Sequence, residues 1–429
     1  MKLFQQMLVA VASVGLIAPT AAQASDTLNL EGINDYSSSK KSSSKTYFDS
    51  KSFVNEVSED LATFKSSEQL NASQNYIEAG SFSDTTTLDS TVIFTVGALN
   101  TPVDGNGANR VSEATKATYM MQSNLNTSFT GDDNLYIRLK TGNASDWQKE
   151  YKYGTYLSSS KGNDDEVKVD KIWYTFPLGD HTFTVGPKIE SYYMHGTTPS
   201  IYKPVLKQFT LGGNAAAYGA STSPGIGWAY KADNGFAISS NFTTKNGHTS
   251  TGVLTKEGDT SWATQIGYTQ PTYSASVIVN QKYNGWTDSY YTTPLGKARS
   301  SEADSTNIGL RGWWRPDDSG TAIPSISVGY DTSSVDGQNA DTSAYFVGLT
   351  WLDAFTPDDR IGLAFGQPQT RDDENVDPFA WELYYSYKMN DSVTITPAIF
   401  GATDRDGRTD DADKAEDMLG AVIETTFKF

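Results

Sequence analysis

Sixteen segments of the chain alternate apolar and polar residues, and the connections between them are by turns short and long. Alternation with period two is typical of β-strands, because successive side chains point to opposite faces of a sheet. The expected strands are residues 88–99, 116–130, 133–141, 166–178, 180–190, 224–232, 234–245, 258–270, 272–283, 304–316, 321–331, 342–354, 358–367, 378–389, 391–403 and 416–429. In an antiparallel sheet, this pattern gathers all short connections at one end of the strands.

The short connections are tight and rich in residues that favour turns, such as Gly131-Asp132 and Met389-Asn390-Asp391. A soluble β-sandwich gives no reason for strict alternation, whereas a transmembrane barrel has short periplasmic turns and long extracellular loops. Lipid cannot satisfy an open sheet edge, so the sheet must close. The sequence therefore predicts an all-β, transmembrane, antiparallel β-barrel of about 16 strands over residues 87–429, wide enough for an aqueous channel.

The last strand shows the expected two faces. Leu419, Ile423, Phe427 and Phe429 fall on one side, and the charged Glu424 falls on the other. A half-buried strand of a soluble sheet has the same pattern, but the alternation of turns and loops favours a lipid-facing apolar side. The terminal aromatic residue then lies in the interfacial belt.

Two segments precede the barrel. Residues 1–24 predict a secretory signal peptide, with one Lys, a short apolar run and an Ala22-Gln23-Ala24 cleavage site. Residues 25–86 predict a periplasmic segment that begins with a Ser/Lys-rich stretch and continues as a helix near residues 52–78. This segment is interpreted as a stalk or plug, or alternatively as a poorly ordered leader.

Composition excludes several functions. The chain has no Cys and three His, which leaves no ligands for a typical His/Cys metal site. We find no nucleophile elbow or phosphate-binding loop, and the acidic run 404–417 lacks EF-hand spacing. A net charge of −18 argues against nucleic-acid partners. The sequence predicts no catalytic residue, no metal and no cofactor.

Charged residues on the polar side of the strands are candidate lumen-lining residues. They lie opposite apolar sets such as Leu135, Ile137 and Leu139. The candidates are Arg138, Lys140, Arg311, Arg315, Glu382, Lys388 and Glu424. An alternative is that such charges only solvate the interior and pair with one another.

The longest connection, residues 191–223, is the candidate constriction. No acidic residue occurs between Glu190 and Asp233, and the segment is apolar and aromatic, which suits it poorly to open water. We expect it to fold into the lumen, to favour anions and to offer rings for sugar stacking, although it could instead latch onto a neighbouring subunit. Its candidate residues are Lys203, Lys207, Tyr192, Tyr193, Tyr202 and Phe209.

Two stretches resemble a known family. PFAWELYYSYKMNDSVTITPAIFGATD (378–404) and TTTLDSTVIFTVGAL (85–99) are similar to the carbohydrate-selective, OprB-type outer-membrane porins, especially their cyanobacterial branch. The resemblance implies a homotrimer, and it implies that Phe427 and Phe429 act as an assembly signal. Residues 25–86 are too short for the surface-layer-homology domain and coiled coil of that branch, so the resemblance does not extend to peptidoglycan anchoring.

Together, these features predict a porin in the cell outer membrane. It would form a water-filled channel for passive diffusion of small hydrophilic solutes, namely inorganic ions and, by the resemblance, sugars. Its partners would be outer-membrane lipid, the solutes and two further copies of itself. The alternatives are a structural or adhesive envelope protein and an outer-membrane enzyme.

Overall fold

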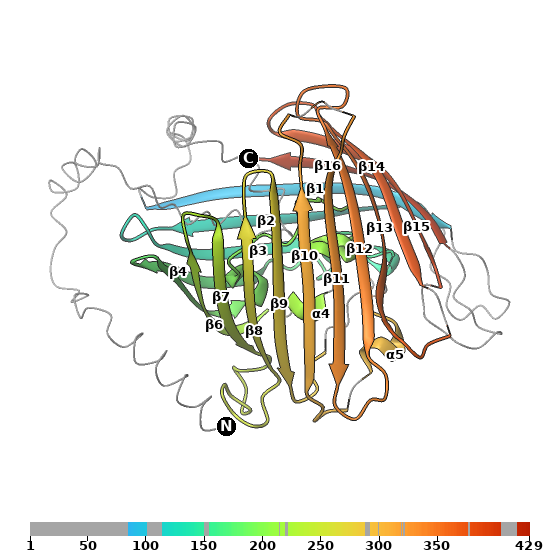
Figure 1. Ribbon diagram of the computed structural model, residues 1–429. Coiled ribbons are helices and arrows are strands. Elements are labelled where there is room, and N and C mark those ends of the chain that lie inside the picture. Colours follow the sequence, from blue (N-terminus) through green and yellow to red (C-terminus); the bar gives the residue numbers. More distant parts are fainter. Residues whose placement is uncertain are drawn as a thin grey trace, which may run out of the picture. The chain divides into compact units, whose positions relative to one another are not determined.

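The computed structural model describes residues 85–100, 114–149, 154–213, 215–218, 222–287, 292–298, 300–318, 320, 322–375, 378–404 and 418–429. Within these residues, sixteen antiparallel strands close into a barrel in which each strand pairs with its sequence neighbours and β1 pairs with β16 (Figure 1). The strands are β1 (Thr86–Asn100), β2 (Lys116–Thr127), β3 (Asn134–Gly142), β4 (Lys168–Leu178), β5 (His181–Ile189), β6 (Ser223–Lys231), β7 (Phe236–Thr244), β8 (Thr260–Thr269), β9 (Tyr273–Tyr283), β10 (Ser305–Trp314), β11 (Ser325–Val335), β12 (Thr342–Leu352), β13 (Arg360–Arg371), β14 (Phe379–Lys388), β15 (Val393–Thr403) and β16 (Met418–Lys428).

The predicted fold class is confirmed, with every expected strand present and its ends shifted by a few residues. The expected signal peptide and periplasmic helix lie outside the described residues. Short helical turns occur between strands: η3 (Asp146–Gln148), η4 (Ser191–Met194), η5 (Lys207–Gly212), α4 (Ala215–Tyr218) and α5 (Pro294–Lys297). Among the described residues, no helix has the length and apolar character needed to cross a membrane.

The two faces of the barrel wall differ in the way that the alternation predicts. On β16, the outward Leu419 and Ile423 are 54% and 52% exposed, whereas Val422 and Glu424 point inward and are buried. Large apolar side chains are likewise exposed on the outside of other strands: Phe94, Val96, Val185, Ile266, Leu310, Val328, Tyr330 and Ile399. An apolar outside and a polar or packed inside is the arrangement of a barrel surrounded by lipid.

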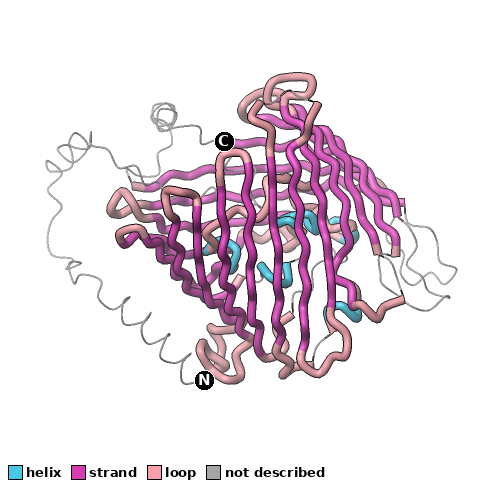
Figure 2. Tube along the Cα trace, in the orientation of Figure 1, coloured by secondary structure: helices cyan, strands magenta, loops and turns pink. Residues whose placement is uncertain are grey.

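An apolar cluster lies inside the barrel. It joins inward side chains of β1 and β12–β16 to residues of two interstrand connections, and Figure 2 shows the helical turns of these connections within the ring of strands. The members of the cluster are Leu99, Trp147, Leu157, Tyr202, Val205, Leu206, Phe209, Phe346, Ala364, Ala380, Tyr384, Ala398, Phe400, Ala402, Met418 and Val422. The inward alanines leave room for these rings, so this part of the lumen is a packed core.

Two turns at the short-connection end share the sequence pattern Phe-Thr-x-Asp-Asp and one hydrogen-bond arrangement. FTGDD (129–133) joins β2 to β3, and FTPDD (355–359) joins β12 to β13. Asp133 accepts hydrogen bonds from the backbone N–H of Phe129 and Thr130, at 2.9 and 2.8 Å, and from the hydroxyl of Tyr174 on β4 at 2.6 Å.

Asp359 repeats this arrangement. It accepts from the backbone N–H of Phe355 and Thr356, at 3.0 and 2.9 Å, and from the hydroxyl of Tyr385 on β14 at 2.9 Å. Phe129 and Phe355 stay 66% and 75% exposed, and each ring lies near the Tyr that binds the same Asp. Each Asp therefore fixes a turn that presents an aromatic ring at the barrel end, where amphipathic belts form.

These carboxylates make turn stability depend on pH. Burial alone would raise the pKa of Asp133 and Asp359, but the hydrogen bonds from Tyr174, Tyr385 and the turn N–H groups outweigh it and hold both pKa values below the usual range. A carboxyl whose pKa is lower in the folded state stabilises the fold above its unfolded pKa, about 3.9. That contribution declines as the pH falls below about 4.

We expect the double substitution Asp133→Asn and Asp359→Asn to lower the free energy of unfolding at pH 7 by about 1–2 kcal/mol per turn, because it weakens charge-assisted hydrogen bonds. The difference in the free energy of unfolding between the double variant and wild type should become smaller below about pH 4. Urea unfolding in lipid vesicles measures both effects. Asp132→Asn, at an exposed position of the first turn, is the matched control. A difference that is the same at pH 7 and pH 2 would contradict this role.

Candidate functional site

The β5–β6 connection, residues 190–222, follows the inner wall of the barrel. The carbonyl of Thr198 accepts from the indole N–H of Trp313 on β10 at 3.1 Å, and the N–H of Ile201 donates to the Ser327 hydroxyl on β11 at 3.1 Å. The segment then reaches β14 and returns, so that Ala217 accepts at 2.8 Å from an amide side chain of β9. The longest connection therefore lies inside the barrel.

Glu382 on β14 holds the middle of this connection. Its carboxylate accepts hydrogen bonds from the Tyr202 hydroxyl at 2.8 Å, from the N–H of Val205 at 3.2 Å and from the N–H of Leu206 at 2.6 Å. The Tyr384 hydroxyl, two residues along the strand, donates to the carbonyl of Lys203 at 2.6 Å. With 0% of its surface exposed, Glu382 anchors the connection and does not line open space.

Arg311 on β10 holds the returning part. Its Nε donates to the carbonyl of Leu211 at 2.7 Å, and its guanidinium pairs with Asp331 on β11 at 2.9 Å. The guanidinium also lies 5.0 Å from the ring centroid of Tyr218. Arg311 points inward, as the alternation predicts, but it is only 4% exposed because the connection covers it.

His195 supports the first part of the connection. It lies against Asn241 on β7, at 3.3 Å between the two side-chain nitrogens, and its ring meets Tyr218 edge to face. Burial lowers the pKa of His195 to about 3, so the imidazole stays neutral at ordinary pH. This contact therefore does not change with pH in the neutral range.

A second connection, residues 143–167 between β3 and β4, also enters the barrel. It forms a bridge between Leu157 and Leu206, and the N–H of Gly154 donates to the Gln208 side chain at 2.7 Å. The Ser159 hydroxyl donates to Glu424 on β16. Glu424 thus anchors this second connection in the way that Glu382 anchors the first.

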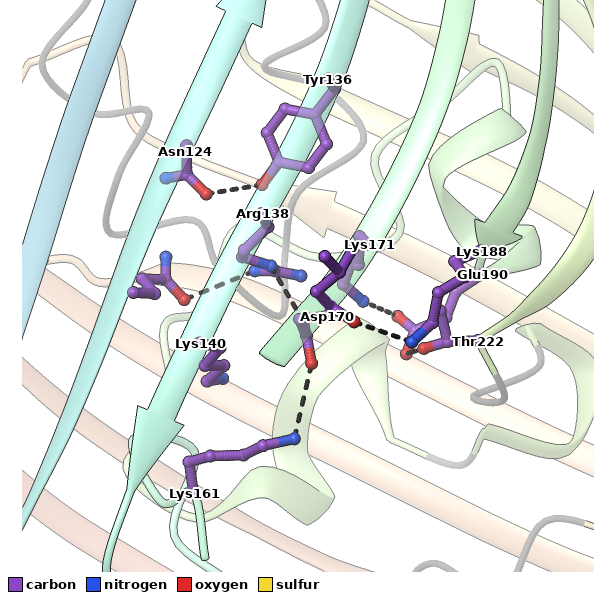
Figure 3. A network of polar contacts seen from close by, with 12 residues as sticks. Asn124, Tyr136, Arg138, Lys140, Lys161, Asp170, Lys171, Lys188, Glu190 and Thr222 are labelled. Atoms are coloured by element: carbon purple, nitrogen blue, oxygen red, sulfur yellow. Dashed lines mark hydrogen bonds and ion pairs between the residues drawn. The ribbon is translucent and has the colours of Figure 1, made fainter. Parts of the chain in front are cut away.

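The opposite wall, β2–β4, carries charge. Arg138 on β3 is paired with Asp170 on β4, with 3.0 Å between Nε and Oδ2, and Lys161 of the β3–β4 connection approaches the other oxygen at 3.5 Å (Figure 3). Lys140 on β3 and Lys207 of the β5–β6 connection interact electrostatically with the same carboxylate. We call Arg138, Lys140, Lys161, Lys207 and Asp170 the basic cluster.

A β-bulge shapes this wall. Arg138 is opposite Lys171 and Leu139 is opposite Val169, so Asp170 between them has no partner on β3. An extra residue in one strand can bring two successive side chains to the same face. Asp170 pairs with Arg138, and the adjacent Lys171 forms a buried ion pair with Glu190, so both lie on the inner side (Figure 3).

The remaining candidates lie in different places. Tyr192 and Tyr193 pack around the Lys171 ammonium, which lies 5.5 and 4.7 Å from their ring centroids. Tyr202 and Phe209 belong to the apolar cluster and are 1% and 2% exposed. Tyr192 and Tyr193 are also only 2% and 8% exposed, so neighbouring side chains cover all four rings, against the expectation that they stack on sugars.

Two candidates lie at the short-connection end. Arg315 directly follows β10 and donates to the carbonyl of Pro271 at 2.7 Å. Lys388 is the last residue of β14 and pairs with Asp358 and Asp391 at 3.0 and 2.9 Å. Both residues fall on the inward face of their strands by the alternation. However, they lie at the rim of the barrel, away from the basic cluster.

The sequence pattern did not identify Lys161, Asp170, Lys171 or Glu190. Asp170 and Lys171 are consecutive, so a regular strand would place them on opposite faces, and only the bulge changes this. Lys161 lies in one of the long connections, for which the alternation of short and long connections predicts an extracellular position. The run VKVDK, residues 167–171, was the available signal, because it places two Lys residues close together on β4.

Comparisons with known proteins bear on the fold. No model of a known protein family matches the sequence. An uncharacterized protein of Nostoc sp., alr4550, is 25% identical over 427 residues, covering 87% of this chain and 71% of that protein. The structure of OprB from Pseudomonas putida is similar with a TM-score of 0.57 and 12% identity, over 84% of this chain and 97% of that one. OmpT of Vibrio cholerae gives a TM-score of 0.49, with 13% identity. The likeness to OprB shows a shared fold.

Proposed function

We propose that the protein is an outer-membrane porin, a water-filled channel for passive diffusion of small hydrophilic solutes. The observation that carries the proposal is the contrast between the two sides of the wall. Apolar side chains are exposed outside a closed barrel, while charged and polar groups of β2–β4 lie inside. Lipid favours the first side and water favours the second.

The inward connections support a narrow passage. The apolar cluster fills the side of the lumen next to β12–β16 and β1, and the β5–β6 connection lines the wall from β7 to β14. We infer that the solute path then follows β2–β4, past the partly exposed Tyr136, Lys140, Lys161 and Asp170. Such a path suits inorganic ions and small neutral solutes, and we infer a channel rather than an enzyme.

The resemblance to OprB-type porins and the structural likeness to OprB support two finer proposals. The first is membership of that carbohydrate-selective family, with sugars among the solutes. The second is a homotrimer embedded in outer-membrane lipid. Lys203 and Lys207 remain proposed constriction residues, whereas Tyr192 and Tyr193, at 2% and 8% exposure, support the wall around Lys171. Phe427 and Phe429 remain the proposed assembly signal.

We expect the purified protein to produce stepwise conductance increases in planar lipid bilayers, because the proposed polar passage along β2–β4 runs through a barrel whose outer surface is apolar. Vesicles that contain the protein should also swell in isotonic small sugars. A vesicle preparation with heat-denatured protein is the control. Correctly inserted protein that gives neither steps nor swelling would favour the structural or adhesive alternative.

A further inference from the structure

We propose that the basic cluster is an anion-selective filter, so that small anions are the preferred solutes of the channel. This inference rests on the proposed channel function and assigns its substrate class. Its basis is that three separate elements bring charge of the same sign to one place: Arg138 and Lys140 from β3, Lys161 from the β3–β4 connection and Lys207 from the β5–β6 connection.

The charge balance of the cluster is positive. Lys140 interacts electrostatically with Arg138, Lys161 and Lys207, and the carboxylate that these four cations share is Asp170. Asp170 lies 3.0 Å from Arg138 Nε and 3.5 Å from Lys161 Nζ, so most of its charge is directed at those two groups. A mobile anion can reduce the remaining repulsion, whereas a cation increases it.

Neighbouring groups keep the cluster in place. The Arg138 guanidinium also donates to the Tyr193 hydroxyl at 3.0 Å, and it is 1% exposed. The Lys207 ammonium lies 5.1 Å from the ring centroid of Tyr156, which supports it by a cation–π contact. Lys171 does not add free charge, because it forms a buried ion pair with Glu190.

Access to solvent differs among the members. Arg138 is covered, while the Lys161 and Asp170 side chains are 33% and 18% exposed, and Lys140 and Lys207 are half-buried. The solvent-accessible part of the cluster is therefore mainly ammonium groups. Charges between low-dielectric walls focus the field and can raise the local concentration of counter-ions by about tenfold or more.

The loop chemistry points the same way. Most connections of this chain are acidic, yet the β5–β6 connection, which brings Lys207 to the cluster, has no acid between Glu190 and Asp233. The overall charge of −18 would attract cations to the protein as a whole. Positive charge on the barrel wall, on Lys161 and on the β5–β6 connection reverses that preference locally.

The test is the reversal potential under a KCl gradient, recorded on wild type and on a Lys140→Gln, Lys207→Gln double variant. We expect wild type to favour chloride over potassium by roughly tenfold and the double variant to lose most of that preference. Lys256→Gln, on an exposed part of the β7–β8 connection, is the matched control and should keep the wild-type ratio.

Each outcome separates the two proposals. Wild-type channels that favour potassium, or an unchanged ratio in a double variant with normal conductance, would overturn the filter and leave the channel function intact. No conductance in correctly inserted wild type would contradict the channel function itself. If the double variant does not assemble, Lys161→Gln gives the same comparison, with an expected fall in the ratio of about twofold. An unchanged ratio there would also overturn the filter.

Discussion

Deletion of residues 427–429 should reduce the membrane-inserted barrel by at least roughly tenfold, because these residues close the sheet. Phe429 and Ser90 exchange two backbone hydrogen bonds, at 3.0 and 2.7 Å, and the N–H of Lys428 donates to the carbonyl of Ser392 at 2.9 Å. Without this end of β16, backbone groups of both neighbouring strands lose their partners. Each unsatisfied group costs several kcal/mol in lipid.

Heat-modifiable mobility on gels and protease resistance in outer-membrane fractions measure the folded amount. The variant Phe429→Ala separates backbone from side chain, because it keeps the exchange with Ser90 and removes only the terminal ring. Phe427→Ala removes the edge-to-face contact with Phe94, whose centroid is 5.3 Å away. Normal amounts of folded protein after the deletion would show that strand closure does not need this end.

Glu382→Ala should increase single-channel conductance severalfold, because it removes the acceptor that holds the β5–β6 connection against β14. The N–H groups of Val205 and Leu206 and the Tyr202 hydroxyl lose their common partner. A buried donor that is left unsatisfied costs about 1–3 kcal/mol. We expect the connection to leave the wall and the passage to widen and fluctuate.

Planar-bilayer recordings measure both the conductance and its noise. Glu382→Gln keeps one acceptor oxygen at nearly the same volume, so its conductance should fall between wild type and Glu382→Ala. Glu302→Ala, at an exposed position between β9 and β10, is the control and should conduct like wild type. A folded Glu382→Ala channel with wild-type conductance and low noise would show that other contacts fix the connection.

The sequence by itself predicted the barrel because the barrel depends on a local property. Alternation along β16 places Ile423 and Glu424 on opposite faces whatever the rest of the chain does, and turn residues such as Gly131 and Asp132 end the strands. The absence of acids between Glu190 and Asp233 was also a usable signal, since an apolar and aromatic connection packs better inside than in water. Both features can be read from neighbouring residues.

The charged site could be predicted only in part. Alternation placed Arg138 and Lys140 inward on β3, but Asp170 required the register of β4 against β3, where a bulge leaves it without a partner. Alternation also could not show that inward connections cover Glu382 and Glu424. Side-chain direction follows from the strand, whereas burial follows from what packs against it.

The sequence alone therefore predicted the strands and the two faces of the wall, and it favoured residues 191–223 as a segment that enters the lumen, with a contact to a neighbouring subunit as the alternative. The tertiary structure alone decided that a second connection enters beside it, that Tyr202 and Phe209 are packed away, and that Lys161 and Lys207 meet Lys140 near Asp170. The physical reason is sequence separation. Strand periodicity acts over two residues, but the basic cluster joins groups whose proximity depends on closing the whole barrel around two folded connections.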